Sequence, residues 1–379
     1  MKKSFKNALT YVEGQGLVNC DITFDEIILS ISEAQGEVMP LPQDAIVLPA
    51  FIDQHIHGAG GSDGMDGTTY DLENIATTIA KEGTATFLAT TMTQSKENIL
   101  KAMQAVKEYR TQPQTGARLV GIHLEGPFIC PKHKGAQPLE YVVEPSVELF
   151  DEYNQASGNC IKIVSLAPEM PNADKLIAHL NDLGVTPSIG HTGATTADVK
   201  NAILKGAKQI THTYNAQSPL HHREIGVVGS ALLYDELATE IICDTIHVSI
   251  PAMQLLVKCK RADKVIMITD AMRAKGLSDG ISELGGQTVI VKNGEARLQD
   301  GTLAGSILLM NRALQNMVEK VGVPFTTAVD FATINPARSL GIDGQTGSIK
   351  VGKRADFVIL NSNYDVLYTI CGGKIIYQA

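Results

Sequence analysis

The chain has 379 residues, of which 44% are hydrophobic and 19% are charged, and this balance is typical of a soluble globular protein rather than of a disordered or fibrous one. Its formal net charge of −9 argues against a general electrostatic attraction to nucleic acid or to an anionic membrane surface, so a phosphorylated ligand would need a local cationic pocket. The six cysteines are widely spaced, without the pattern of a zinc ribbon or the density of a disulfide scaffold, and we expect reduced thiols.

The first residues of the chain are basic, but no continuous apolar stretch follows them, which argues against a secretory signal peptide. No segment of the sequence approaches the roughly 18 consecutive apolar residues of a membrane helix. We therefore expect a cytoplasmic protein that binds neither a membrane nor nucleic acid.

Both ends of the chain carry the same pattern. Residues 1–50 contain alternating polar and apolar runs separated by glycine turns, and similar runs return in residues 344–379. Such runs are typical of antiparallel strands and hairpins. We predict that the two ends pair into one small β-sandwich domain and that residues 51–343 form a separate, larger domain.

Short β-rich apolar runs alternate with amphipathic stretches through the middle of the chain, which predicts repeated βα units and a parallel sheet. The eight β-rich runs are residues 47–57, 84–91, 119–125, 161–167, 185–191, 209–215, 240–247 and 264–270. Outer helices are predicted where apolar residues recur every three or four positions, in residues 72–81, 97–109, 174–183 and 197–205. Eight such units favour an α/β fold of the TIM-like (β/α)8 barrel type.

The eighth βα unit is interrupted by an insertion. Residues 276–305 contain the glycine-rich sequence GGQTVIVKNGEARLQDGTLAG, which predicts a small excursion of β structure. After it, the helical part of the unit is expected to continue through residues 308–321 and 325–332.

The end of the first predicted barrel strand carries two imidazoles, His55 and His57. Active sites of such barrels lie at the carboxyl ends of the strands, so both residues are well placed for chemistry. The period of two in a strand puts both side chains, and Asp53 before them, on one face, where the imidazoles can share a metal. An isolated pair of this kind is as often two ordinary polar residues, so its meaning depends on the other strand ends.

The third strand ends in a carboxylate, Glu125, directly after an apolar run. Burying a carboxylate is costly unless it meets a cation, and a metal ion is the simplest cation here. The alternatives are a cap on the following turn or a pair with an arginine. His123 lies two residues earlier on the same face, and it is either a support for the site or a plain core residue.

Two further imidazoles, His191 and His212, stand at the ends of the fifth and sixth strands. A histidine at one of these places alone would more often be a core residue. Together with Glu125 they form a set of two nitrogens and one oxygen that suits zinc or another divalent transition metal. Three protein ligands leave a coordination position for water, and such an open site is typical of catalysis rather than of structure.

The eighth strand ends in Asp270, which we predict to be the general base. A metal ion lowers the pKa of its bound water, and a nearby carboxylate can then accept a proton and return it to a leaving nitrogen. Direct metal ligation is the competing role for this side chain, and the two roles are compatible. His247, after the seventh strand, is expected to donate to a developing oxyanion or to orient the substrate.

The loop after the sixth strand offers Asn215, the backbone of Ala216, and Arg223 as contacts for a substrate. A guanidinium suits bidentate binding of phosphate, so Arg223 is the candidate for the local cationic pocket. The alternative is a surface arginine that pairs with Glu224 or with another acid.

Seven phrases of the sequence, PAFIDQHIHG, GIHLEGPFI, SIGHTGAT, THTYNAQSPLHHRE, DTIHV, ITDA and GTLAGS, occur in this order over most of the chain. In this combination the chain resembles the N-acetylglucosamine-6-phosphate deacetylase family of the amidohydrolase superfamily. The LEGP, HTYNA and ITDA phrases together set this family apart from dihydroorotases, hydantoinases and deaminases. Those relatives often bridge two metals with a modified lysine, and Glu125 takes that place here.

The resemblance implies that Glu125, His191 and His212 hold the main metal and that Asp270 is the acid and base. It implies zinc as the first choice of metal, with iron, cobalt, manganese and nickel as alternatives. Some members of the family lack the histidine pair of the first strand, but this chain keeps His55 and His57, so one or two ions per chain are expected. The implied substrate contacts are Ala136, Gln137, Asn215, Ala216, Arg223, His247, Leu303, Ala304 and Gly305.

The activity implied by the resemblance is removal of the acetyl group from N-acetylglucosamine 6-phosphate, which yields glucosamine 6-phosphate and acetate. The alternatives are the galactosamine epimer of this substrate, another C–N or cyclic amide hydrolysed on the same barrel, and a barrel relative without catalysis. The last should lack ligands or base, and this chain has both. Some members place a histidine where this chain has Gln137. Family dimers can carry the phosphate-binding arginine into the neighbouring site. We therefore expect a homodimer, and Arg223 serves either the site of its own chain or that of its partner.

Overall fold

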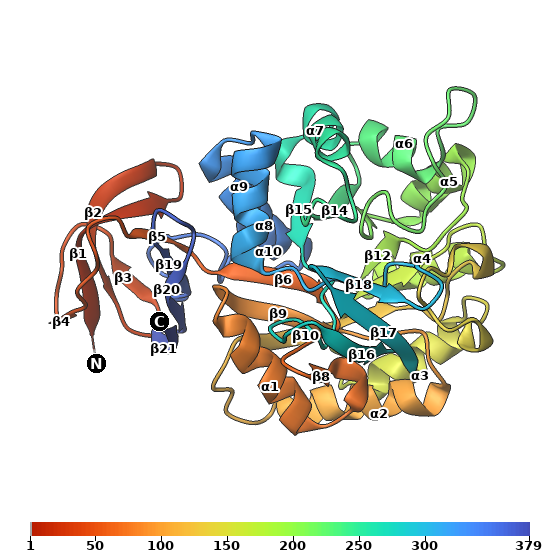
Figure 1. Cartoon of the computed structure of the whole chain (residues 1–379), viewed down its shortest axis with the longest axis horizontal. Coiled ribbons are helices and arrows are strands. Elements are labelled where there is room, and N and C mark those ends of the chain that lie inside the picture. The colour runs from red at the N-terminus through yellow and green to blue at the C-terminus, as the bar shows by residue number, and fades with distance from the viewer. Residues whose placement is uncertain (1) are drawn as a thin grey trace.

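Eight parallel strands form the barrel at the centre of the molecule (Figure 1), in a computed structural model that describes residues 2–379. Along the sheet they follow the order β15-β14-β13-β12-β11-β10-β9-β6, so each strand pairs with its neighbours in the chain. The barrel strands are β6 (Phe51–Ile56), β9 (Thr84–Thr90), β10 (Arg118–Glu125), β11 (Ile161–Leu166), β12 (Thr186–Ile189), β13 (Gln209–Ile210), β14 (Ala238–Ile242) and β15 (Val265–Ile268). The predicted (β/α)8 fold class is confirmed.

The barrel closes between its first and last strands. Three backbone hydrogen bonds join their ends, from the Asp270 N–H to the His55 carbonyl at 2.8 Å and from the His57 and Gly58 N–H groups to the Ala271 carbonyl at 2.8 and 3.0 Å. The predicted first strand, residues 47–57, is two strands instead of one. Its first half, β5 (Ile46–Pro49), belongs to the terminal sheet, and β6 belongs to the barrel. Both halves are buried, so the sequence reads as one continuous apolar run.

Helices cover the outside of the barrel (Figure 1), and several begin at a hydroxyl cap that satisfies free backbone N–H groups. The Ser95 hydroxyl, for example, accepts from the Asn98 N–H at 3.3 Å. The helices are α1 (Thr69–Ala80), α2 (Lys96–Tyr109), α3 (Val147–Ala156), α4 (Ala173–Asp182), α5 (Thr196–Lys205), α6 (Gly226–Leu233), α7 (Ile250–Cys259), α8 (Met310–Asn316), α9 (Phe325–Ala332) and α10 (Ile334–Ser339). A π-helical turn, η5 (Met317–Val321), prolongs α8. The helices predicted from periodicity are therefore confirmed. None of the helices in residues 2–379 is both long enough and apolar enough to cross a membrane.

Short elements complete the barrel domain. They are β7 (Gly58–Ala59), β8 (Ser62–Asp63) and the 3-10 turns η1 (Gly64–Asp66), η2 (Pro131–His133), η3 (Leu139–Tyr141) and η4 (Ala262–Lys264). The predicted β excursion is also present, as the antiparallel strands β16 (Gly280–Leu284), β17 (Gln287–Lys292) and β18 (Glu295–Leu298). Leu284, Val289 and Ala296 of this small sheet are buried in one cluster with Met92 and Met272. The excursion therefore packs on loops that follow β9 and β15.

Both ends of the chain build a separate β domain, which stands to one side of the barrel (Figure 1). Its strands form one sheet of eight, in which β5 from the N-terminal part pairs with β19 from the C-terminal part. The strands are β1 (Lys3–Val12), β2 (Gly16–Phe24), β3 (Ile28–Ser30), β4 (Glu37–Val38), β5, β19 (Phe357–Leu360), β20 (Val366–Cys371) and β21 (Lys374–Gln378). The domain limits at residues 50 and 344 stay a prediction.

Candidate active site

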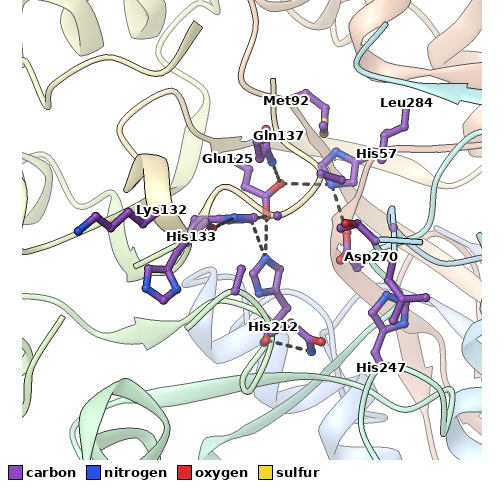
Figure 2. Close-up of a pocket in the computed structure, with 18 residues that line it drawn as sticks. His57, Met92, Glu125, Lys132, His133, Gln137, His212, His247, Asp270 and Leu284 are labelled. Atoms are coloured by element: carbon purple, nitrogen blue, oxygen red, sulfur yellow. Dashed lines mark hydrogen bonds and ion pairs between the residues drawn. The ribbon is translucent and has the colours of Figure 1, made fainter. Parts of the chain in front are cut away.

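A cavity of about 320 Å³ opens at the carboxyl ends of the barrel strands (Figure 2). Of the imidazoles and carboxylates predicted from the sequence, all but His55 reach its walls. The residues that line it are His57, Met92, Glu125, Lys132, His133, Gly135, Ala136, Gln137, His191, His212, Asn215, Ala216, His247, Asp270, Leu284, Thr302, Leu303 and Gly305. Leu284 comes from the β excursion, which therefore forms part of the wall.

Glu125, His191 and His212 converge at the floor of the cavity, and all three are buried. The Glu125 Oε1 atom lies 3.4 Å from His191 Nε2 and 3.1 Å from His212 Nε2. The two Nε2 atoms are 3.1 Å apart. Three ligand atoms of the kind that zinc prefers thus surround one point.

A second group of ligand atoms shares the same carboxylate. His55 Nε2 lies 3.3 Å from Glu125 Oε1, and His57 Nε2 lies 3.4 Å from Glu125 Oε2. Glu125 therefore stands between the two histidine pairs, and both sides of it offer a set of donors for an ion. Burial disfavours the charged carboxylate, but the charge of His55 and the hydrogen bonds from His191 and His212 hold the pKa of Glu125 well below its usual range.

The donors fit a divalent metal ion. The His55 Nε2 atom is buried and has no hydrogen-bond partner among residues 2–379, although it points toward the carboxylates of Glu125 and Asp270. A buried polar atom without a partner costs free energy of about 1–3 kcal/mol. A bound cation would remove that cost and would balance two buried carboxylates at the same time. The chemistry of these residues therefore fits a divalent metal.

Three of the residues that close on this point have a left-handed backbone, which side chains other than glycine rarely adopt. The φ angles are +50° at His191, +29° at His212 and +49° at Asp270. Each of these residues follows the end of a barrel strand, and the unusual backbone turns its side chain inward. Such conformations cost about 1–3 kcal/mol each and are typical of functional sites.

Asp270 lies beside His57 of the first strand (Figure 2), and His55 is close to both. Its Oδ1 atom is 3.1 Å from His57 Nε2 and 3.4 Å from His55 Nε2. Burial would raise the pKa of Asp270, but the charges of His55 and His57 lower it to about 2. The carboxyl group is therefore ionised near neutral pH and can accept a proton. The backbone of Gly305 passes so close that an added Cβ would lie 3.1 Å from the Asp270 carbonyl oxygen.

The first barrel strand departs from regular alternation. Its pairing with β9 shifts register between Asp53 and Ile56. As a result Gln54 and His55, which are neighbours in the chain, both bond to Glu240. Asp53 instead accepts a hydrogen bond from the Thr269 hydroxyl at 2.5 Å. The expectation that Asp53 shares the face of the two histidines is wrong, because a bulge lies between them.

His123 belongs to the polar interior of the barrel below the cavity. Its Nε2 atom lies 2.7 Å from the Ser165 hydroxyl, and its Nδ1 atom lies 3.2 Å from the Gln54 carbonyl. Both ring nitrogens therefore have protein partners. Of the two roles considered for this residue, the structure supports a buried polar support rather than a ligand.

Known proteins resemble this chain in sequence and in structure. The model of the amidohydrolase family matches residues 46–376 of the chain. The chain is 45% identical to N-acetylglucosamine-6-phosphate deacetylase of Bacillus subtilis (strain 168), over 91% of this chain and 88% of that protein. It is 37% identical to N-acetylgalactosamine-6-phosphate deacetylase of Escherichia coli O157:H7, over 90% and 88%.

A solved structure agrees with these sequences. The chain superposes on the crystal structure of N-acetylglucosamine-6-phosphate deacetylase from Pasteurella multocida with a TM-score of 0.94, at 31% identity over 100% of both chains. The chain belongs to the N-acetylglucosamine-6-phosphate deacetylase family of amidohydrolases. The family expected from the sequence motifs is thereby confirmed.

His247 is held by a carboxylate that the sequence reasoning missed. Its Nδ1 atom lies 2.5 Å from Asp244 Oδ2, while Asp244 Oδ1 accepts the backbone N–H groups of Ile246 and His247 at 2.8 Å each. The sequence DTIH, at the turn after β14, could have indicated this contact, because its aspartate and histidine lie three positions apart. With one ring nitrogen fixed in this way, His247 lines the cavity opposite Glu125 (Figure 2).

Gln137 lines the cavity, but its side chain is used inside the protein. Its amide nitrogen donates to Glu125 Oε2 at 2.7 Å, and its amide oxygen accepts from the Thr93 N–H at 2.7 Å. The structure thus gives Gln137 the role of holding Glu125. Direct substrate contact stays a prediction for this residue.

The other predicted substrate contacts fall into two groups. Those that line the cavity are Ala136, Asn215, Ala216, Leu303 and Gly305. Ala304 and Arg223 do not: Ala304 is fully buried behind the lining, and Arg223 is exposed, with its guanidinium 2.8 Å from His222 Nε2.

The expectation of a cationic pocket built by Arg223 of the same chain is therefore not met, because its side chain is exposed and does not line the cavity, although Asn215 and Ala216 of the same loop do. The cationic side chain in the wall is Lys132, with His133 beside it. Sequence reasoning passed over both residues, although KHK in the loop after β10 is a visible cluster of basic groups.

Proposed function

We propose that the protein removes the acetyl group from N-acetylglucosamine 6-phosphate and releases glucosamine 6-phosphate and acetate. One observation carries the proposal: Glu125 and four imidazoles converge at the floor of one cavity, with the ionised Asp270 beside them. The identity of the substrate is taken from the names of the deacetylases that match about nine-tenths of the chain.

A divalent metal held by Glu125, His191 and His212 would act as a Lewis acid and would lower the pKa of water at the site. A second ion can be held by His55 and His57 on the other side of Glu125. We propose zinc, because two nitrogens and one carboxylate oxygen suit it best, with iron, cobalt, manganese and nickel as the alternatives. Gln137 keeps Glu125 turned toward both ligand sets through its 2.7 Å hydrogen bond.

Asp270 moves the proton in this proposal. Its carboxylate accepts a proton from the attacking water and delivers it to the amide nitrogen as the bond to the acetyl carbon breaks. His247 donates a hydrogen bond to the acetyl oxygen, where negative charge develops. Asp244 supports this role, because its carboxylate accepts from Nδ1 and stabilises the imidazolium form of His247, whose Nε2–H is then free to donate to the substrate.

The sugar phosphate is proposed to lie along the wall formed by Lys132, Asn215, Ala216 and Leu303. Arg223 is exposed on its own chain, which suits a residue that reaches the cavity of a second copy in a homodimer. This arrangement is the reason for proposing a dimer. A cytoplasmic location is part of the proposal as well, and the six free cysteines fit a reducing compartment.

The direct test is acetate release from N-acetylglucosamine 6-phosphate, combined with elemental analysis of the purified protein. We expect bound zinc or a related metal, turnover of the phosphorylated substrate, loss of turnover after chelation, and its return when zinc is added. A protein that is loaded with metal yet releases no acetate would contradict the proposal.

The galactosamine epimer is the second candidate substrate, because a relative named for that substrate is 37% identical over 90% of the chain. The same assay run on both epimers decides between them. A higher kcat/KM for N-acetylgalactosamine 6-phosphate would replace the first proposal while leaving the chemistry of the site unchanged.

A further inference from the structure

Glu240 is a fully buried carboxylate in β14, inside the barrel below the metal site, and its two oxygens accept four hydrogen bonds. Oε1 accepts from the side-chain amides of Gln54 at 2.8 Å and Gln209 at 2.9 Å. Oε2 lies 3.0 Å from His55 Nδ1 and accepts the His212 backbone N–H at 3.2 Å. Glu240 thus bonds to one histidine of each pair of the site, His55 and His212.

The contact with His55 determines which of its ring nitrogens serves as a ligand. A carboxylate that accepts the Nδ1–H proton leaves the lone pair on Nε2. That Nε2 atom is the one that faces Glu125 at 3.3 Å and has no hydrogen-bond partner in the described chain. Histidine ligands of metals usually donate their second N–H to such a carboxylate, which orients the ring and raises its basicity.

His55, His123 and Glu240 also lie close enough together to suggest an ion site of their own. The hydrogen bonds argue against this reading. Both nitrogens of His123 already have partners, at Ser165 and Gln54. Both oxygens of Glu240 are likewise occupied by donors. The three residues therefore form a hydrogen-bonded support rather than a coordination shell.

We propose that Glu240 is a positioning residue that makes His55 a metal ligand and ties it to the backbone of His212. It would thereby set how tightly the ion between His55 and His57 is held. This inference rests on the metal dependence proposed above. It goes beyond it by assigning a function to a carboxylate that touches neither the ion nor the substrate.

The variant E240Q tests the inference, because its amide group can lie in either of two orientations and its nitrogen faces hydrogen-bond donors in both. Toward Oε2 it would oppose His55 and the His212 N–H, and toward Oε1 it would oppose Gln54 and Gln209. Loss of a supporting carboxylate typically weakens metal binding by about 10- to 100-fold. We expect this loss for one ion per chain, measured as zinc competition between the metal-free protein and a chromophoric chelator.

Two further variants show whether the effect passes through His55. H55Q should weaken zinc binding at least as much as E240Q, and the double variant should lose no more than H55Q alone. Ser165→Ala is the matched control, because Ser165 lies in the same buried network and bonds to His123 but not to Glu240. Its zinc affinity should equal that of the wild type.

Four results would overturn the proposal: wild-type zinc binding in E240Q, wild-type zinc binding in H55Q, additive losses in the double variant, or an equal loss in Ser165→Ala. Thermal unfolding of each metal-free variant checks the fold. If E240Q does not fold, E240D replaces it, since it keeps the charge on a shorter side chain and should still weaken zinc binding. The measurements use no substrate, so a failure of the proposed deacetylase activity would leave their outcome unaffected.

Discussion

The terminal β domain and the mouth of the barrel use buried residues in opposite ways. The core of the β domain is apolar, and three of its rings, Phe5, Phe24 and Phe357, pack with centroids 5.0 to 5.6 Å apart. The barrel mouth buries imidazoles and carboxylates, with left-handed backbone at Asp270 and an unpartnered nitrogen on His55. The first region is complete by itself, whereas the second depends on an ion that the chain must bind. Substitutions in the two regions should therefore separate stability from activity.

The largest effect is expected for Asp270→Asn. The amide keeps the size of the side chain but cannot accept a proton, so kcat for acetate release should fall by about 10²- to 10⁴-fold. Zinc content should stay at the wild-type level, because the carboxylate and imidazoles of the main ligand set remain. Wild-type turnover in this variant would remove Asp270 from the proton-transfer role.

His247→Gln is expected to follow. Loss of a donor to the developing oxyanion should lower kcat by about 10²- to 10³-fold. Because His247 is not among the proposed ligands, elemental analysis should give unchanged zinc. A change confined to KM, with kcat preserved, would assign His247 to substrate binding alone.

Phe24→Ala probes the other region. Its ring is fully buried, so the free energy of unfolding should fall by about 3–5 kcal/mol, measured by denaturant titration. At temperatures where the variant stays folded, its kcat and zinc content should match those of the wild type. A specific loss of zinc would show that the two regions are coupled more closely than their cores suggest.

Lys132→Ala and Arg223→Ala compare a cation inside the cavity with one outside it. Each hydrogen bond to a charged group contributes about 1.5–3 kcal/mol, so loss of a phosphate contact should lower kcat/KM roughly tenfold or more for the phosphorylated substrate only. Unphosphorylated N-acetylglucosamine serves as the control substrate. If Arg223→Ala lowers kcat/KM in this way and dilution of the wild type to monomers does the same, the arginine acts in trans. If neither variant changes kcat/KM for the phosphorylated substrate relative to the control substrate, the phosphate site lies elsewhere.

The smallest effect is expected at a helix cap on the outside of the barrel. The Thr195 hydroxyl accepts the Asp198 N–H at 3.3 Å at the start of α5. Thr195→Ala should cost about 1 kcal/mol of stability without changing zinc affinity. A thermal unfolding curve and a zinc titration on the same sample check both parts, and a change in zinc affinity would mean that the site responds to any loss in the barrel.

The sequence predicted the parts of the site that a strand pattern can carry. Glu125, His191, His212 and Asp270 each stand at or just beyond the end of an apolar run, and parallel strands bring such ends to one rim. The family motifs named the same residues. For this reason the barrel, the β excursion and the group of ligands could all be expected before the structure.

The remaining parts depend on features that periodicity does not record. The register shift in β6 separates the side-chain contacts of Asp53 from those of His55, and a pattern of alternating residues cannot reveal such a shift. Gln137 bonds to Glu125 through a loop whose path is set by tertiary packing. Glu240 lies in the middle of the stretch TEIIC, where a lone acid gives no sign that it will meet an imidazole from another strand.

The seam of the barrel has a consequence for the newly made chain. Two of the hydrogen bonds that join the first and last strands come from Asp270 and His57 themselves, so the act of closing the cylinder also delivers the aspartate to its place. A ribosome-bound chain that ends before β15 already contains the histidines at the floor of the cavity, but it lacks Asp270, the proposed proton acceptor. With Asp270 as the proposed proton acceptor, a chain that ends before the eighth strand is expected to release no acetate.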